Sequence, residues 1–165
     1  MSSSAAAASI ELPDAPATAR IGAALAAHLQ GGDTIALVGD LGAGKTTFVI
    51  GLVDALGGGT ATSPTFSLVN EYPGGRLVVL HIDLYRIEKE AELVELGLDE
   101  IVGNPRGVAL IEWADKYPDV LPRDYLRIEL IHEVEDSRRL IATGTGSRGQ
   151  SLIAAMNQSL NSGRT

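Results

Sequence analysis

Residues 39–46 read GDLGAGKT, which is a complete G-x-x-x-x-G-K-[ST] phosphate-binding loop. In such a loop, successive backbone N–H groups and the positive end of the following helix converge on bound phosphates. Lys45 would bind the β and γ phosphates, and the Thr46 hydroxyl would bind Mg²⁺. The sequence therefore predicts a nucleoside triphosphate site. The expected nucleotide contacts are Gly39, Asp40, Leu41, Gly42, Ala43, Gly44, Lys45, Thr46 and Thr47.

Two carboxylates stand at the ends of apolar runs. Asp83 follows the run at 77–82, and Glu112 follows the run at 108–111. Ligands of open α/β sheets bind at the carboxyl ends of the strands, so we expect both side chains beside the phosphate loop. One would hold Mg²⁺, while the other orients the attacking water or accepts its proton. The residues alone leave open which carboxylate takes which role.

Thr65 follows Ser63-Pro64, where it could sense the γ-phosphate from a switch-like loop. A β-branched residue at the start of a strand explains Thr65 equally well. Trp113, directly after Glu112, fits a packing role and a functional role equally. The histidines form no metal-ligand spacing, and we expect structural roles for His28, His81 and His132.

Periodicity indicates the elements that position these side chains. The apolar run at 34–38 predicts a strand, and apolar residues at 48, 52 and 56 predict a buried helix after the loop. Asp14 would cap an earlier helix that ends at Gly31-Gly32. We also expect a hairpin at 66–72 and 76–82, a buried strand at 107–113, paired strands at 126–130 and 138–143, and a helix through 152–160.

Composition bounds the architecture. The chain has 165 residues, 45% of them apolar, which suits one α/β domain with a sizeable core. We expect a disordered tail at 1–9, because Ser and Ala bury little surface, then one domain at 10–160 and a frayed tail at 161–165. No run approaches the ~20 apolar residues of a membrane span. Cysteine is absent, which fits a cytoplasmic protein.

Thirteen basic and 21 acidic residues give a net charge of −8. This charge argues against a surface that grips nucleic acid, because such binding relies on Lys and Arg. Proteins and small molecules are therefore the favoured partners. The acidic run at 88–95 predicts a short helix whose charges form a solvated face, with a docking surface as the alternative.

Five motifs occur in a fixed order along the chain: GDLGAGKTTF, SPTFSLVNEY, HIDLYRI, ELGLDEI and IEWAD. Their order and spacing resemble the bacterial TsaE family over roughly residues 12–155. The phosphate loop alone is unspecific, but SPTF, DLYR and EW after it are highly specific. The chain departs from the family at Ala114, where proline usually follows Glu-Trp.

The resemblance implies an α/β, P-loop NTPase-like three-layer fold with a central mixed sheet flanked by helices. It implies ATP as the nucleotide, in line with the lack of an Asn-Lys-x-Asp guanine-reading segment, and Mg²⁺ held by Thr46 and Glu112. Asp83 becomes the catalytic or water-positioning carboxylate, assisted by Lys45 and by Thr65 in the switch-like loop. The contacts implied for adenine and ribose are Asp14, Ala15 and Arg139.

The resemblance also implies a function. It implies an ATPase that works with a TsaD-like transferase and a TsaB-like subunit in making threonylcarbamoyladenosine on tRNA, and that meets tRNA only indirectly. Hydrolysis would support turnover of the transferase complex and would be weak in the isolated protein. Two alternatives remain: a small-molecule kinase with Asp83 as its base, and a nucleotide-dependent binding switch that needs no catalysis.

Overall fold

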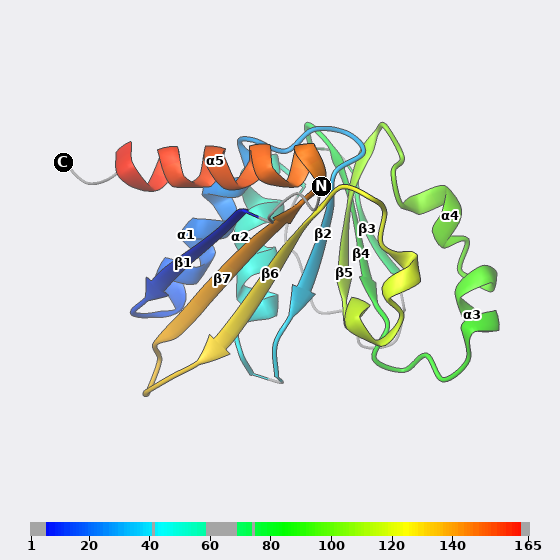
Figure 1. Cartoon of the computed structure of the whole chain (residues 1–165), viewed down its shortest axis with the longest axis horizontal. Coiled ribbons are helices and arrows are strands. Elements are labelled where there is room, and N and C mark those ends of the chain that lie inside the picture. Colours follow the sequence, from blue (N-terminus) through cyan, green and yellow to red (C-terminus); the bar gives the residue numbers. More distant parts are fainter. Residues whose placement is uncertain (1–5, 41, 59–68, 74, 163–165) are drawn as a thin grey trace.

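The computed structural model describes residues 6–40, 42–58, 69–73 and 75–162 (Figure 1). In these residues the predicted periodicities become seven strands, five α-helices and two short 3-10 turns. In chain order they are β1 (Ala6–Leu12), α1 (Ala15–Ala26), β2 (Thr34–Val38), α2 (Lys45–Leu56), β3 (Val69–Tyr72), β4 (Val78–Asp83), α3 (Glu90–Glu95), α4 (Leu98–Ile101), β5 (Gly107–Glu112), η1 (Ala114–Lys116), η2 (Pro118–Val120), β6 (Tyr125–His132), β7 (Arg138–Thr145) and α5 (Gly146–Ser162).

The strands form one mixed sheet in the order β1-β7-β6-β2-β5-β4-β3. Strand β2 lies in the middle and runs parallel to both β5 and β6, and β4 is parallel to β5. The outer pairs β3–β4, β6–β7 and β1–β7 are antiparallel. The predicted hairpin and the predicted strand pair are thereby confirmed. Of the first predicted strand, residues 66–68 lie outside the described residues.

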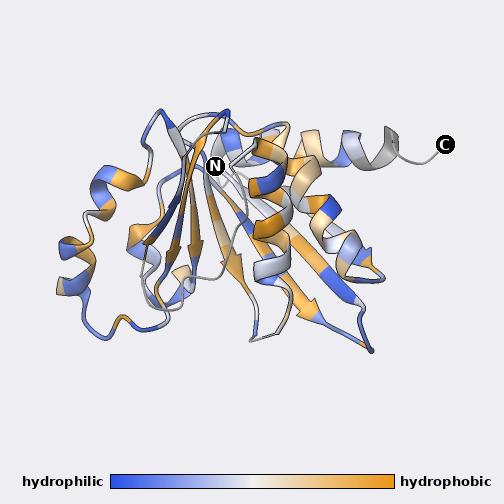
Figure 2. Cartoon of the chain, turned by 180° about the vertical axis from the view of Figure 1, so that it is seen from behind, coloured by the Kyte–Doolittle hydropathy of each residue, from blue (hydrophilic) through white to orange (hydrophobic). Residues whose placement is uncertain are grey.

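Alternate residues of the central strands face two separate cores. Ile35 and Leu37 of β2 pack in the core under α1, α2 and α5, whereas Ala36 packs in the core on the other face. Strand β5 repeats this alternation and is buried along its whole length, as its uninterrupted apolar run predicted. Figure 2 shows the apolar strands between the helices. The α/β fold with a central mixed sheet is therefore confirmed.

The N-terminal prediction needs a correction. Residues 6–9, expected in a disordered tail, belong to β1, which pairs antiparallel with β7 from Ala6 to Leu12. An edge strand is held by backbone hydrogen bonds, so it forms even where the side chains are small. Ala8 and Ile10 also pack against the main core. Residues 1–5 lie outside the described residues.

Two helix ends also differ from prediction. Helix α1 ends at Ala26 rather than at Gly31-Gly32, and the chain then tightens into turns in which the N–H of Leu29 bonds to the carbonyl of Ala26. The Arg76 guanidinium also donates to the carbonyls of Ala26 (2.7 Å) and Leu29 (3.0 Å). Leu29 nevertheless stays in the core. At the other end of the chain, α5 continues to Ser162 instead of fraying from residue 161, and residues 163–165 lie outside the described residues. No helix in the described ranges has the length and apolar character needed to cross a membrane.

Candidate nucleotide-binding site

The phosphate loop joins the central strand β2 to helix α2, as its motif predicts. Gly44 caps α2 with a φ of 104°, a conformation that favours glycine, and no side chain caps the first N–H groups of the helix. At Gly39, an added Cβ would lie 2.6 Å from the carbonyl oxygen of Leu130, so the loop passes close to β6. The loop therefore presents free helix N–H groups to an anion. Leu41 lies outside the described residues.

The Lys45 side chain is buried at the start of α2, with 7% of its surface exposed. Its ammonium group donates to the carbonyl oxygen of Gly39 at 2.7 Å and lies 4.0 Å from Oε1 of Glu112. It also lies 4.5 Å from the centre of the Trp113 ring. The cation is thus held between the loop and the end of β5.

The predicted acidic pair meets at the carboxyl edge of the sheet. Asp83 and Glu112 are register partners on β4 and β5, and Glu112 is also paired with Leu37 of β2. One cleft brings the pair together with the phosphate loop. Its lining is Gly42, Gly44, Lys45, Thr46, Thr47, Asp83, Tyr85, Glu112, Trp113 and Arg138.

Burial raises the pKa of Asp83 above its ordinary value of 3.8, and the nearby charge of Glu112 adds to that shift. The backbone N–H of Tyr85, 2.9 Å from Oδ1, acts in the opposite direction, as do the charges of His81 and Lys45. A carboxylate with a raised pKa is a better proton acceptor than an ordinary aspartate. This is the property that the predicted role requires.

His81 is a site residue whose contact sequence reasoning missed. Its Nε2 lies 2.6 Å from Oε2 of Glu112, and both side chains are buried. When Glu112 is ionised, Nε2 carries the proton and donates it. Among the described residues, Nδ1 has no hydrogen-bond partner. The available signal was strand alternation, since His81 precedes Asp83 by two residues and so shares its face.

Arg138, and not Arg139, reaches the phosphate loop. Its Nε donates to the carbonyl of Ala43 and its Nη2 to that of Gly42, both at 3.1 Å. The predicted nucleotide contact, Arg139, instead pairs with Glu133 (2.8 Å) and Glu11 (3.4 Å). Adjacent residues of a strand point to opposite faces, which accounts for the difference.

The remaining predicted residues lie at the start of α1 or outside the described ranges. Asp14 caps α1, accepting the N–H of Ala17 at 2.8 Å. A Cβ at Gly44 would lie 3.7 Å from Cγ2 of Thr18, so the first turn of α1 lies beside the loop. Adenine contacts from Asp14 and Ala15 stay predictions. Thr65 lies outside the described residues.

The site has the donors that Mg²⁺ prefers. Thr46 offers a hydroxyl and Glu112 a carboxylate, and both line the cleft at the phosphate loop. Mg²⁺ in nucleotide sites is bound through one or two such oxygens together with substrate phosphates and water. In the described part of the chain, no group of three or more His, Asp or Glu side chains is arranged to hold a metal ion.

Comparison with known proteins identifies the family of the chain. A sequence model of the family described as "Threonylcarbamoyl adenosine biosynthesis protein TsaE" matches residues 12–141. The TsaE protein of Bacillus subtilis is 40% identical over 134 residues, covering 81% of this chain and 83% of that protein. That of Nostoc sp. is 39% identical over 149 residues, covering 88% and 91%. The crystal structure of YdiB from Bacillus subtilis superposes with a TM-score of 0.81 at 32% identity, covering 95% of this chain and 98% of that one.

The family match spans far more than half of the chain, and the relatives agree with it over most of their own length. The chain belongs to the TsaE family, whose role lies in the biosynthesis of threonylcarbamoyladenosine on tRNA.

Proposed function

We propose that the protein is a Mg²⁺-dependent ATPase that supports a TsaD-like transferase and a TsaB-like subunit in this modification of tRNA. The observation that carries the proposal is the cleft at the phosphate loop, where Lys45, Thr46, Asp83 and Glu112 come together. A phosphate loop alone would fit many nucleotide-binding proteins. The two carboxylates at the ends of β4 and β5 add the groups that hydrolysis needs.

Thr46 and Glu112 would hold the Mg²⁺, which neutralises charge on the phosphate oxygens when bound. His81 keeps the Glu112 carboxylate in place through its hydrogen bond. Lys45 and the first N–H groups of α2 would bind the β and γ phosphates. The ammonium already lies at the loop, where it donates a hydrogen bond to the Gly39 carbonyl at 2.7 Å.

Asp83 would orient the attacking water and accept its proton. The water oxygen forms a bond to the γ-phosphorus while the bond to the β–γ bridging oxygen breaks, giving ADP and phosphate. The raised pKa of Asp83, caused chiefly by burial, favours this transfer. Lys45 stabilises the charge that develops on the departing phosphate oxygens.

The partners would complete the cycle. A net charge of −8 disfavours direct tRNA binding, so the protein would act on tRNA through the transferase and its companion subunit. Hydrolysis can reset such a complex only if the partners bind the ATP and ADP states with different affinity. We expect weak turnover in the isolated protein and strong stimulation by the partner pair.

Phosphate release from ATP tests the proposal. It is measured with and without the purified TsaD-like and TsaB-like proteins, for wild type, Lys45→Ala, Asp83→Ala and the control Glu71→Ala, whose carboxylate is exposed on β3. We expect stimulation in wild type and the control, and its loss in the two site variants. Normal stimulated hydrolysis by Asp83→Ala would disprove the assigned mechanism. ADP formation that depends on an added acceptor, with a phosphorylated product, would identify a kinase instead.

A further inference from the structure

An apolar groove lies between α3–α4 and the two 3-10 turns. Leu93 and Val94 of α3 and Val102 after α4 line one side, and Tyr117 and Val120 line the other. Val94 is 78% exposed, more than any other large apolar side chain in the described residues, and α3 buries none of its residues. Figure 1 shows the two helices at the edge of the molecule, apart from the layer of α1, α2 and α5. Covering such a surface with an apolar partner lowers the free energy, because apolar area is removed from water.

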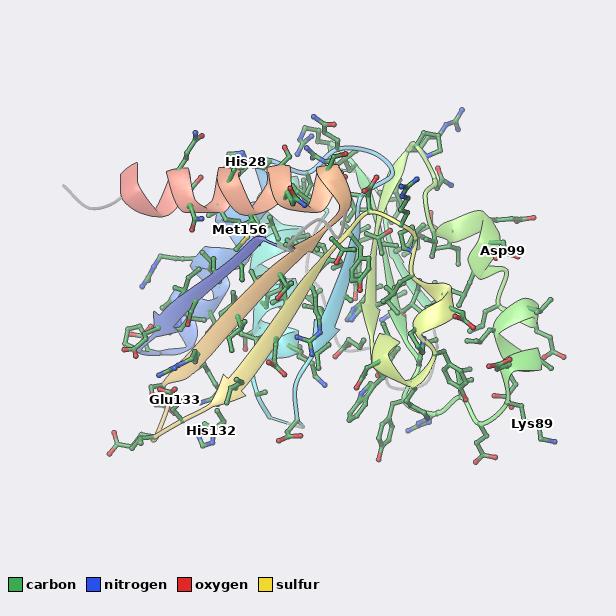
Figure 3. The ribbon with its side chains drawn as sticks, in the orientation of Figure 1. His28, Lys89, Asp99, His132, Glu133 and Met156 are labelled. Atoms are coloured by element: carbon green, nitrogen blue, oxygen red, sulfur yellow. The ribbon has the colours of Figure 1, made fainter. Side chains whose placement is uncertain are left out.

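The rim of the groove is acidic. Glu90, Asp99 and Asp119 line it, and residues 88–100 contain six acidic side chains against one lysine. None of these carboxylates forms an ion pair with another described residue. Figure 3 shows Asp99 and Lys89 at the outer edge, directed away from the sheet. The apolar floor with unpaired carboxylates around it favours the docking surface over the solvated acidic face, the two interpretations that the sequence left open.

We propose that this groove docks a protein segment whose apolar side chains are bracketed by lysine or arginine. The inference rests on the proposed function, because it names the surface through which the partner pair would bind. Apolar side chains would cover Val94 and its neighbours, while the flanking cations pair with the rim carboxylates. An RNA backbone is the wrong occupant, since its phosphates would be repelled by the same carboxylates.

The groove is physically connected to the nucleotide site. Lys116, which lines it, donates from its ammonium to the carbonyls of Tyr85 and Ile87, both at 2.9 Å. The Tyr117 hydroxyl donates to the same Ile87 carbonyl at 3.0 Å. These bonds hold the segment that leads from Asp83 to α3. A segment bound in the groove therefore contacts the residues that fix the position of the Asp83 loop, which offers a route for partner-stimulated hydrolysis.

Val94→Glu tests the apolar floor. Glutamate is a good helix former and Val94 is exposed, so the variant should fold and keep its basal phosphate release. Its Kd for the purified TsaD-like and TsaB-like pair, measured by calorimetry with ATP present, should rise at least about tenfold, with loss of stimulation. Val134→Glu is the matched control, because Val134 is 72% exposed on the β6–β7 turn. Its Kd should stay within about twofold of wild type.

The double variant Glu90→Lys/Asp99→Lys tests the rim. The wild-type Kd should rise with salt, because screening weakens charge pairs, and the double variant should bind weakly with a reduced salt dependence. Wild-type binding by Val94→Glu, or an equal loss of binding in Val134→Glu, would disprove docking in the groove. Neither result would contradict the proposed ATPase function. If Val94→Glu without partners sedimented differently from wild type while Val134→Glu did not, the groove would instead bind a second copy of this chain, and the proposed docking of the partner segment would be wrong. A wild type that is neither bound nor stimulated would defeat the proposed function as well.

Discussion

Asp83 is subject to two opposing requirements. The proposed chemistry needs its ionised form, whereas burial and the charge of Glu112 disfavour that form and raise its pKa. The backbone N–H of Tyr85 compensates only in part. A half-buried carboxylate whose pKa is raised in this way is typical of active sites.

Asp83→Asn should therefore lose activity without losing stability. We expect stimulated phosphate release to fall about a hundredfold or more, because the amide cannot accept the proton of water. A raised pKa in the folded state means that the native carboxyl is favoured at low pH and disfavoured as it ionises. The stability of the variant relative to wild type should then increase as pH rises from the ordinary value of 3.8 through the raised pKa of Asp83. Urea denaturation across this range measures the difference, with Glu71→Gln as control. If the free energy of unfolding of the wild type instead increased relative to that of the variant with rising pH, the raised pKa of Asp83 would be contradicted.

His81 acts on Glu112 rather than on the nucleotide, since its Nε2 lies 2.6 Å from the carboxylate. His81→Leu should raise the Mg²⁺ concentration that gives half-maximal phosphate release by about tenfold or more, because Glu112 loses the donor that orients it. His81→Gln keeps an N–H donor and should recover part of the loss. Mg²⁺ titrations of both variants, after their folding is checked by circular dichroism, provide the measurement. The same Mg²⁺ dependence in His81→Leu and wild type would rule out this positioning role.

At the scale of elements, local patterns were predictable and partner-dependent ones were not. The sequence predicted the loop and α2 because glycine spacing and helical periodicity lie within a short stretch of chain. The contact of His81 with Glu112 depends on the register between β4 and β5, which no single segment encodes. Whether Arg138 or Arg139 contacts the phosphate loop depends on which face of β7 is turned toward that loop. Strand β1 forms on an edge that β7 offers, and no local pattern in residues 6–12 indicates that edge.

The link between β7 and the phosphate loop gives a test at this scale. Arg138→Ala removes two hydrogen bonds to loop carbonyls, so the loop should be less fixed and ATP affinity should fall about tenfold. Arg139→Ala is the matched control, because it removes only ion pairs with Glu133 and Glu11. Titration calorimetry with ATP compares the two. Loss of affinity in Arg139→Ala instead would support the nucleotide contact predicted for that residue.

Across the whole molecule, a partly buried ion pair joins α5 to the end of the central strand that lies opposite the nucleotide site. Arg148 of α5 donates to both carboxylate oxygens of Asp33 at 2.8 Å and to the carbonyl of His28 at 2.8 Å. Asp33 also accepts the N–H of Gln30 at 2.8 Å. Only 5% of the Asp33 side chain and 27% of the Arg148 side chain are exposed, so water replaces these partners only in part when the carboxylate is removed.

Asp33→Ala should therefore destabilise the fold by about 2–4 kcal/mol, because it leaves the Arg148 charge and the Gln30 N–H without their partner. Arg127→Ala is the control: its pair with Glu129 is about one-third exposed, and its loss should change stability by less than about 1 kcal/mol. Urea unfolding measures both. ATP affinity per folded molecule should stay at the wild-type value in Asp33→Ala, because Asp33 lies before the first residue of β2 and the phosphate loop lies after its last residue. A loss of affinity without loss of stability would instead show that the two ends of β2 are coupled.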